Sequence, residues 1–178
     1  SKQPTINHAV DEVHMQCGNF QITKRPDGSS TWIKTGEDIP HIKDSGDRTE
    51  FATGAVRDMR EGKGRCDLIP LDLLAAELQS TVLTELENYR QTRKRHYLHN
   101  VLDFFCREAY GGCSETMYLE LSKHYEEAAK KYEEDNWKKG IPYHCYIDSA
   151  VRHYLKWRRG DTDEHHNRAF VWNIVGLA

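Results

Sequence analysis

Hydrophobic residues recur every three or four positions from residue 71 onward, which is the spacing of an amphipathic α-helix. The first helix predicted by this pattern covers 71–90, and Pro70 suits its start because proline has no N–H group to leave unpaired there. Its apolar positions are Leu71, Leu74, Leu78, Val82 and Leu86. The basic stretch QTRKRH then reads as a solvated turn, and a second helix follows over 96–110.

Three more helices are predicted between the glycines at 111–112 and the C-terminus. They cover about 115–134, about 143–158 and 169–178. The last of them, AFVWNIVGLA, is apolar almost all round, so we expect it in the middle of a helical bundle. Asp161 and Glu164, three positions apart, predict a capping box before it. The fold class predicted is all-α.

The first fifty residues differ in composition, because they are rich in Gly, Pro, Ser, Thr and Asp. Within them, strands are predicted at 20–24 and 31–34, joined by a turn at Pro26, Asp27 and Gly28. The segments 36–50 and 51–71 have the composition of loops. We therefore expect a small N-terminal β-hairpin arm at 1–50 and a helical domain at 51–178.

Charge and cysteine content exclude several classes of protein. The net charge of −3 gives no general attraction to nucleic acid or to anionic membranes. No apolar run is long enough for a membrane span, and the N-terminus has no apolar signal core. The five cysteines include no CxxC pair, which predicts reduced thiols and a cytoplasmic protein.

Candidate chemistry begins with polar residues on the last two helices. Asn173 shares a helix face with His166 and needs a hydrogen-bond partner, which is either a neighbouring helix or a ligand. Asp148 and Arg152 lie four positions apart, so they form either an intrahelical ion pair or part of a metal site.

Two other groups of charged residues have simpler explanations that also stay open. Glu126 and Glu127 each precede a lysine by four positions, so helix-surface ion pairs explain them as well as metal binding does. The glycine-rich loop TGAVRDMREGKGRCD carries Arg57, Lys63 and Arg65, which suit phosphate oxygens or a solvated loop.

Several of these stretches together resemble one family, the dATP/dGTP diphosphohydrolases of phages and prophages, which are related to all-α MazG-like nucleotide pyrophosphohydrolases. The matching segments are TGAVRD (53–58), EGKGRCDLIP (61–70), KHYEEAAKKY with NWKKGIP (123–142), DSAVRHYLKW (148–157) and GDTDEHHNRAFVWN (160–173). The chain departs from the pattern at Ala128, at His165 and at Asn173, which stands about where an acid is usual.

The resemblance implies a MazG-like helical core and metal-dependent hydrolysis of dATP or dGTP to monophosphate and pyrophosphate. It implies Mg²⁺ or Mn²⁺ held by Glu126, Glu127, Asp148 and Asp163, with Glu126, Asp148 and His166 as the catalytic residues. The substrate-binding residues that it implies are Arg57, Lys63, Arg65, Lys131, Asn136, Trp137, Arg152 and Asn173. It also implies a homo-oligomer whose partner is a purine nucleotide, in the cytoplasm of a bacterial host.

Two rival functions remain at this stage. The first is a protein of the same fold that binds a nucleotide or a nucleotide signal without cutting it, for example as a phage sponge against a host defence. The second is a structural helical protein whose polar residues only cap helices and keep the surface solvated.

Overall fold

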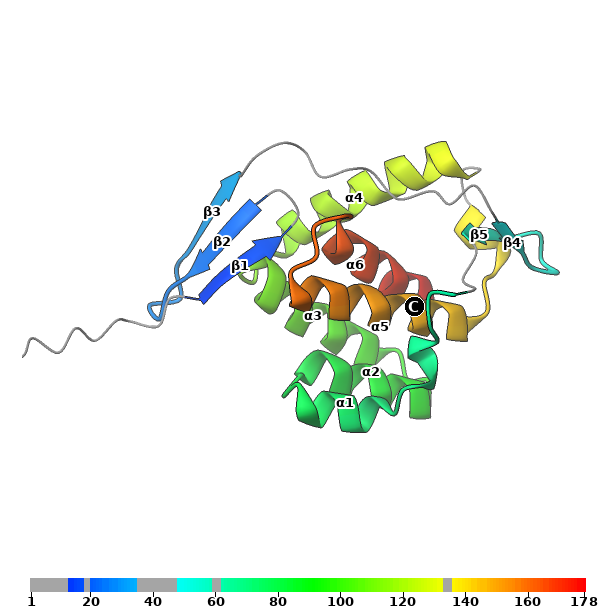
Figure 1. Ribbon diagram of the computed structural model, residues 1–178, viewed down its shortest axis with the longest axis horizontal. Helices are drawn as coiled ribbons and strands as arrows, with labels where there is room; N and C mark the ends of the chain where they lie inside the picture. The colour runs from blue at the N-terminus through cyan, green and yellow to red at the C-terminus, as the bar shows by residue number, and fades with distance from the viewer. Residues whose placement is uncertain (1–12, 18–19, 35–47, 59–61, 133–135) are drawn as a thin grey trace, which may run out of the picture.

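The structure is a computed structural model that describes residues 13–17, 20–34, 48–58, 62–132 and 136–178 (Figure 1). Its described part is mostly helical, with a small antiparallel sheet near the N-terminus, which confirms the predicted fold class. The α-helices are α1 (Leu71–Glu77), α2 (Thr81–Thr92), α3 (His96–Tyr110), α4 (Ser114–Lys131), α5 (Tyr143–Arg159) and α6 (His166–Leu177). Two 3₁₀ helices, η1 (Cys66–Leu68) and η2 (Asn136–Lys139), complete the helical elements.

The last helix lies at the centre of the bundle, as its apolar sequence predicted. Helix α6 packs against α5, α4 and α3, and Figure 1 shows α5 and α6 side by side beneath α4. Phe170 of α6 is fully buried, and its ring lies 4.4 Å from that of Phe105 on α3. Tyr154 and Trp157 of α5 surround the same Phe105 ring at 6.1 and 5.0 Å. Aromatic side chains therefore join α3, α5 and α6.

The single helix predicted over 71–90 is wrong, because the chain forms α1 and α2 with a break between them. Gln79 adopts a left-handed backbone with φ of 49°, which no continuous α-helix allows. The Ser80 hydroxyl then accepts a hydrogen bond from the Leu83 N–H at 3.2 Å and so caps α2. The local preference of serine for a helix start outweighs the continuous apolar spacing.

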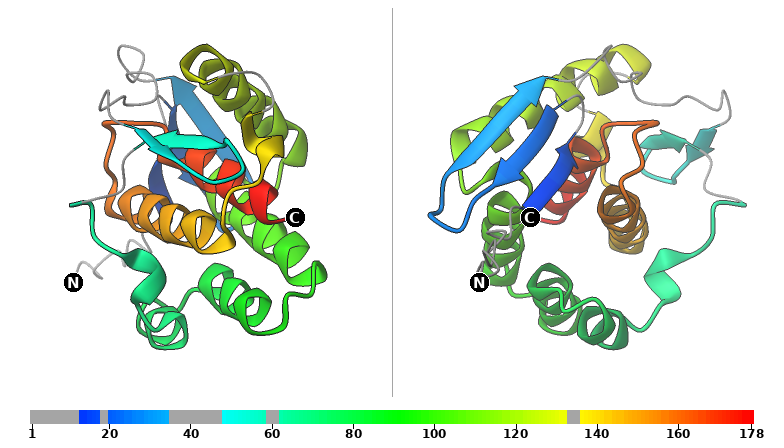
Figure 2. Two further views of the ribbon diagram at one scale, coloured as in Figure 1. Left: turned by 90° about the vertical axis from the view of Figure 1, so that its right-hand side faces the viewer. Right: turned by 60° about the vertical axis from the view of Figure 1, so that its left-hand side comes forward.

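The N-terminal sheet has three strands where two were predicted. Strands β2 (Phe20–Lys24) and β3 (Ser30–Lys34) form the expected hairpin, and β1 (Val13–Cys17) pairs antiparallel with the other side of β2. Ile22 is fully buried in the same hydrophobic cluster as the helices. Trp32 stacks on Tyr110 with ring centroids 6.0 Å apart, so the sheet covers the end of α3 (Figure 2).

A second, two-stranded sheet replaces part of the predicted loop. Strand β4 (Arg48–Glu50) pairs antiparallel with β5 (Val56–Asp58) around a turn at 51–55. It lies at the end of the molecule opposite the first sheet, beside η2 (Figure 1). Residues 36–47 of the predicted loop lie outside the described residues. This sheet matters for function because it carries Arg57 to the helices.

The predicted capping box before the last helix is wrong. Helix α6 begins at His166, three residues before the predicted start, and no side chain caps it at His165. Asp161 instead pairs with the Arg159 guanidinium, with Oδ1 2.7 Å from Nε. The acid therefore neutralises the basic end of α5 and cannot cap α6.

Two exclusions made from composition can be compared with the structure. Cys66, Cys106, Cys113 and Cys145 all carry free thiols, as predicted. Within the described ranges, none of the helices combines the length and the apolar character that crossing a membrane requires.

Candidate functional site

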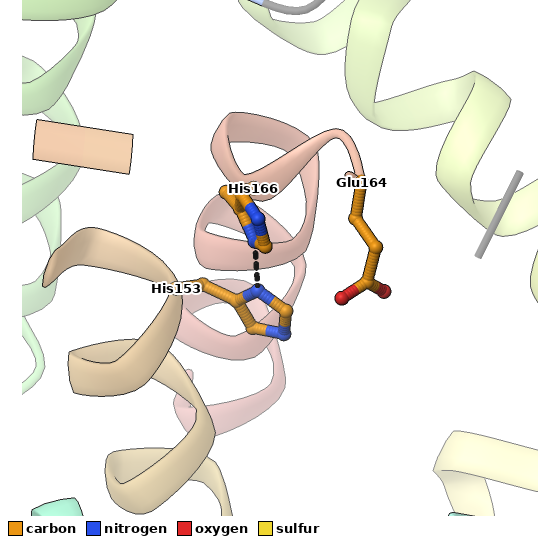
Figure 3. A group of neighbouring side chains, drawn as sticks. All are labelled: His153, Glu164 and His166. Atoms are coloured by element: carbon orange, nitrogen blue, oxygen red, sulfur yellow. Dashed lines mark hydrogen bonds between the residues drawn. The ribbon is translucent and has the colours of Figure 1, made fainter. Parts of the chain in front are cut away.

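Two histidines meet where α5 turns back into α6. Gly160 ends α5 in a left-handed conformation with φ of 88°, and the next residues return the chain so that His166 opens α6. The Nδ1 atoms of His153 and His166 lie 2.9 Å apart, and Figure 3 shows the two rings facing each other. Because His166 is only 1% exposed, protein groups decide what its imidazole contacts.

A carboxylate fixes the orientation of the second ring. Asp163 Oδ1 lies 2.6 Å from Nε2 of His166, so we assign the proton to Nε2, which donates to the carboxylate. Nδ1 of His166 then faces Nδ1 of His153. The pKa of His153 is well below its ordinary value because burial disfavours the charged ring and His166 adds repulsion. His153 is therefore neutral at pH 7.

Possible metal ligands gather at the same turn. Among the described residues, His153, Glu164 and His166 have ligand atoms within 4.8 Å of one another, and so do Asp161, Asp163 and His166. Figure 3 shows the Glu164 side chain extending towards the His153 ring from the start of α6. Neither group includes Glu126, Glu127 or Asp148.

The Asp148–Arg152 pair makes hydrogen bonds to the backbone of a neighbouring segment. Asp148 is fully buried, and its two oxygens lie 2.8 and 2.7 Å from Nη2 of Arg152. Its Oδ1 also accepts the Cys66 N–H at 2.7 Å, while Nη2 of Arg152 donates to the Gly64 carbonyl at 2.8 Å. The pair therefore attaches the η1 segment to α5, as the ion-pair interpretation of the sequence predicted.

Arg57 and Asn173 form a third polar contact. Nη2 of Arg57 donates to Ser149 Oγ at 2.9 Å and to Asn173 Oδ1 at 3.1 Å, while Asn173 donates to the Ala169 carbonyl at 2.7 Å. The guanidinium also lies over the rings of Tyr146 and Trp172, 5.3 and 5.7 Å from their centroids. The Asn173 amide thus has the partners that its burial requires.

One nitrogen of this guanidinium is not satisfied. Nη1 of Arg57 is buried and has no hydrogen-bond partner among the described residues. Burial lowers the pKa of Arg57, because the charged form loses hydration, but an arginine stays protonated at neutral pH. A buried cationic N–H without an acceptor is a place where an anion would be stabilised.

A neutral histidine lies beside these groups on α4. His124 is buried 5.6 Å from the Trp172 ring, and desolvation lowers its pKa to about 4. Glu127 opposes this shift, whereas Arg168, His165 and Arg57 reinforce it. Glu127 is therefore close enough to influence the ring electrostatically, although no direct bond between them follows from that.

The remaining predicted residues lie mostly at the surface. Glu126 has 69% of its side chain exposed and lies 4.0 Å from Lys130. Lys131 contacts the Tyr132 ring at 5.4 Å, Lys63 is exposed, and Arg65 pairs with Asp67 at 2.7 Å. Asn136 and Trp137 belong to η2, but their side chains lie outside what the structure describes.

The structure thus joins the predicted residues in pairs. It brings Asp163 to His166, Arg57 to Asn173 and Asp148 to Arg152. Sequence reasoning missed His153 and Glu164, which the structure places beside His166. The available signal was the turn itself: His153 lies seven residues before Gly160 and His166 six after it, and an antiparallel helix pair brings such positions together.

Comparison with known proteins gives one match. A family model described as "dATP/dGTP diphosphohydrolase, N-terminal" matches residues 113–178, which contain α4, α5 and α6. No curated protein and no solved structure matches the chain. The match covers less than half of the 178 residues, and it supports the resemblance drawn from the sequence.

Proposed function

We propose that this protein hydrolyses a purine deoxynucleoside triphosphate, dATP or dGTP, to the monophosphate and pyrophosphate. The family match over residues 113–178 carries the proposal, since these residues contain both histidines of the α5–α6 turn and Asn173. A relation to MazG-like pyrophosphohydrolases, a phage origin and assembly as a homo-oligomer belong to the same proposal.

Arg57 is the residue we propose for phosphate recognition. Its buried Nη1 has no acceptor in the described part of the chain, and a phosphate oxygen is an acceptor of the right charge. Asn173 and Ser149 hold the other nitrogen, Nη2, so the guanidinium is oriented before any ligand arrives. The exposed Lys63 would add attraction for the triphosphate without fixing its position.

Three of the four carboxylates implied by the resemblance, Glu126, Glu127 and Asp148, do not fit a magnesium site in this arrangement. Both oxygens of Asp148 are engaged by Arg152, and one also accepts the Cys66 N–H. Glu126 is mostly exposed, and neither it nor Glu127 belongs to a group of converging ligands among the described residues. We therefore derive no catalytic step from Mg²⁺ held by these residues.

The histidine pair offers a role that the chain itself supplies. With Asp163 accepting its Nε2–H, the Nδ1 atom of His166 faces Nδ1 of His153 at 2.9 Å. Once a water molecule takes the place of the His153 contact, such a ring can orient that water or accept its proton as the water attacks phosphorus. We propose His166 for this role and Asp163 as the residue that keeps its tautomer.

One observation favours the rival function of binding without hydrolysis. The buried acid expected to ligate metal, Asp148, is already neutralised by Arg152 and attaches the η1 segment to α5. If no other group activates water, the same cationic contacts would bind a nucleotide and leave it intact.

One experiment separates the two functions. The protein is incubated with dATP, dGTP and, as a base control, dTTP, each with Mg²⁺ or Mn²⁺, and pyrophosphate and monophosphate are measured. The proposal expects both products in equal amounts from a purine substrate. Recovery of intact, protein-bound dATP or dGTP with no pyrophosphate rejects hydrolysis and favours the binding protein.

A further inference from the structure

We propose that His153, His166 and Glu164 form a binding site for one first-row transition-metal cation such as Zn²⁺, with Asp163 orienting the His166 ring. The site is built across the turn between α5 and α6, and its three ligand groups lie within 4.8 Å of one another. The proposal is independent of the role proposed for His166 in hydrolysis, because a bound cation would occupy the same Nδ1 lone pair and metal binding is measured without any substrate.

The spacing of the two rings suits a shared cation. Two imidazole nitrogens on a tetrahedral Zn²⁺, each about 2.05 Å from the ion, lie about 3.3 Å apart. The two Nδ1 atoms are 2.9 Å apart without an ion. The rings would therefore separate by only about 0.4 Å on binding, which rotation about side-chain torsions can supply without moving either helix.

The hydrogen bond to Asp163 prepares the His166 ring for this role. A histidine that binds metal through one nitrogen usually donates its other N–H to a carboxylate or a carbonyl. His166 has this arrangement, since Nε2 faces Asp163 Oδ1 at 2.6 Å and Nδ1 faces His153. The carboxylate keeps the proton on Nε2 and leaves the Nδ1 lone pair available for a cation.

The other group of converging ligands is less suitable. It needs Asp161, Asp163 and the Nε2 atom of His166, so Nε2 would have to lose the proton that it donates to Asp163. Asp161 is also paired with the Arg159 guanidinium, with Oδ1 2.7 Å from Nε. The group with Glu164 keeps both the Asp163 hydrogen bond and that ion pair, and it requires only that His153 carry its proton on Nε2 instead of donating Nδ1–H to His166.

The donor set indicates the class of cation. Two imidazoles and one carboxylate are typical of Zn²⁺ and of other first-row transition metals, whereas Mg²⁺ prefers oxygen ligands only. Three protein ligands leave at least one coordination position for water or for a phosphate oxygen. Two neutral rings and one carboxylate also leave a divalent cation with a net charge of +1, which suits an anionic ligand.

Cobalt titration tests the site directly. Chelator-treated protein without a histidine tag is titrated with Co²⁺, and the visible absorption of the bound ion is recorded, followed by displacement with Zn²⁺. We expect one equivalent of Co²⁺ with the intense bands of a four- or five-coordinate ion, and Zn²⁺ should remove them. We also expect His153→Gln and Glu164→Gln to weaken binding at least about 100-fold, because each removes a ligand.

The matched controls are two variants that keep the three ligands. His99→Gln replaces an exposed histidine on α3 and should leave the titration unchanged. Asp163→Asn keeps an oxygen that can accept the His166 N–H, so we expect Co²⁺ affinity to fall about 10-fold, within the range known for such supporting residues. Circular dichroism and melting of each metal-free variant establish that it is folded.

Three results would overturn the proposal. The first is wild-type protein that shows no saturable Co²⁺ binding at concentrations up to about 100 μM. The second is binding that His153→Gln leaves unchanged. The third is binding that Asp163→Asn abolishes while Glu164→Gln retains it, since that pattern assigns the cation to the other group of ligands. If His153→Gln does not fold, the partly exposed Glu164 still decides between these outcomes.

Discussion

Two polar clusters lie on neighbouring turns of α5 and differ in how completely the protein satisfies them. In the first, Asp148 has Arg152 and the Cys66 N–H as partners, and no part of its side chain is exposed. In the second, His153 and His166 share one short contact and lie beside Glu164, whose carboxylate reaches towards them. The first cluster holds two segments together, and the second brings two imidazole rings and a carboxylate close to one another.

The difference explains why residue type alone is a poor guide to function here. A buried acid needs either a metal or a set of hydrogen-bond donors, and the η1 segment supplies the donors for Asp148. Among the described residues, no Arg or Lys forms a hydrogen bond with the Nδ1 atom of His153 or of His166. The two Nδ1 atoms contact each other, so the cation that we propose would replace their mutual contact and would not break an ion pair of either ring nitrogen.

The largest expected effect is the loss of stability when Asp148 is replaced. Replacing Asp148 with Ala leaves Arg152 buried without its counterion and the Cys66 N–H without its acceptor, which typically costs about 3–5 kcal/mol of unfolding free energy. Urea unfolding of the variant measures this cost. Asp103→Ala, at an exposed position on α3, is the control and should change stability by less than about 0.5 kcal/mol. Equal effects at the two positions would contradict a structural role for Asp148.

The next effect is acid destabilisation through His124. Its pKa is about 4 in the folded protein, below the ordinary value of 6.5, so the unfolded chain binds more protons between these two pH values. Stability from this residue is therefore lost as the pH falls from 6.5 towards 4, and about 2 kcal/mol should disappear between pH 7 and pH 5.

Urea unfolding at those two pH values checks this expectation. His124→Gln should reduce the loss, whereas the exposed His99→Gln should not. Some acid sensitivity should remain in His124→Gln, because the pKa of His153 is also lowered by burial. An unchanged pH dependence in His124→Gln would show that this ring is not the source.

A smaller effect is expected on nucleotide affinity when Arg57 is replaced. Arg57→Gln removes the positive charge and the unsatisfied N–H, so we expect dATP affinity to fall about 10- to 100-fold, the equivalent of about 1.5–3 kcal/mol for a charged hydrogen bond. Arg95→Gln, at an exposed position before α3, is the control for loss of charge alone. Nucleotide titration by calorimetry measures both. An equal loss in the two variants would mean that the effect is general electrostatics.

Much of the fold was predictable because apolar spacing and turn residues act locally. The helix at 96–110, its end at Gly111 and the hairpin of β2 and β3 all follow from a few adjacent residues. The break at Gln79 and the strands β1, β4 and β5 did not follow. Strand pairing depends on a partner elsewhere in the chain. The left-handed Gln79 precedes the Ser80 cap of α2, which the continuous apolar spacing of 71–90 does not indicate.

The candidate site was predictable only in part, for a related reason. The pairing of Asp148 with Arg152 and the need of Asn173 for a partner follow from helix geometry within one element. The partner of Asn173, Arg57, comes from β5, more than a hundred residues earlier, and no local rule identifies it. His153 was missed because its importance appears only when the turn at Gly160 places α5 against α6.

The smallest expected effect concerns Glu126, which lies on α4 and belongs to neither of the two polar clusters of α5. Its side chain is 69% exposed and lies 4.0 Å from Lys130, an arrangement that contributes at most about 0.5 kcal/mol. Glu126→Gln should therefore leave urea unfolding and Co²⁺ binding unchanged. Its effect on pyrophosphate release is the informative measurement, because a carboxylate that ligates Mg²⁺ only when substrate is bound would lower turnover without changing stability. Unchanged turnover would exclude Glu126 from the reaction.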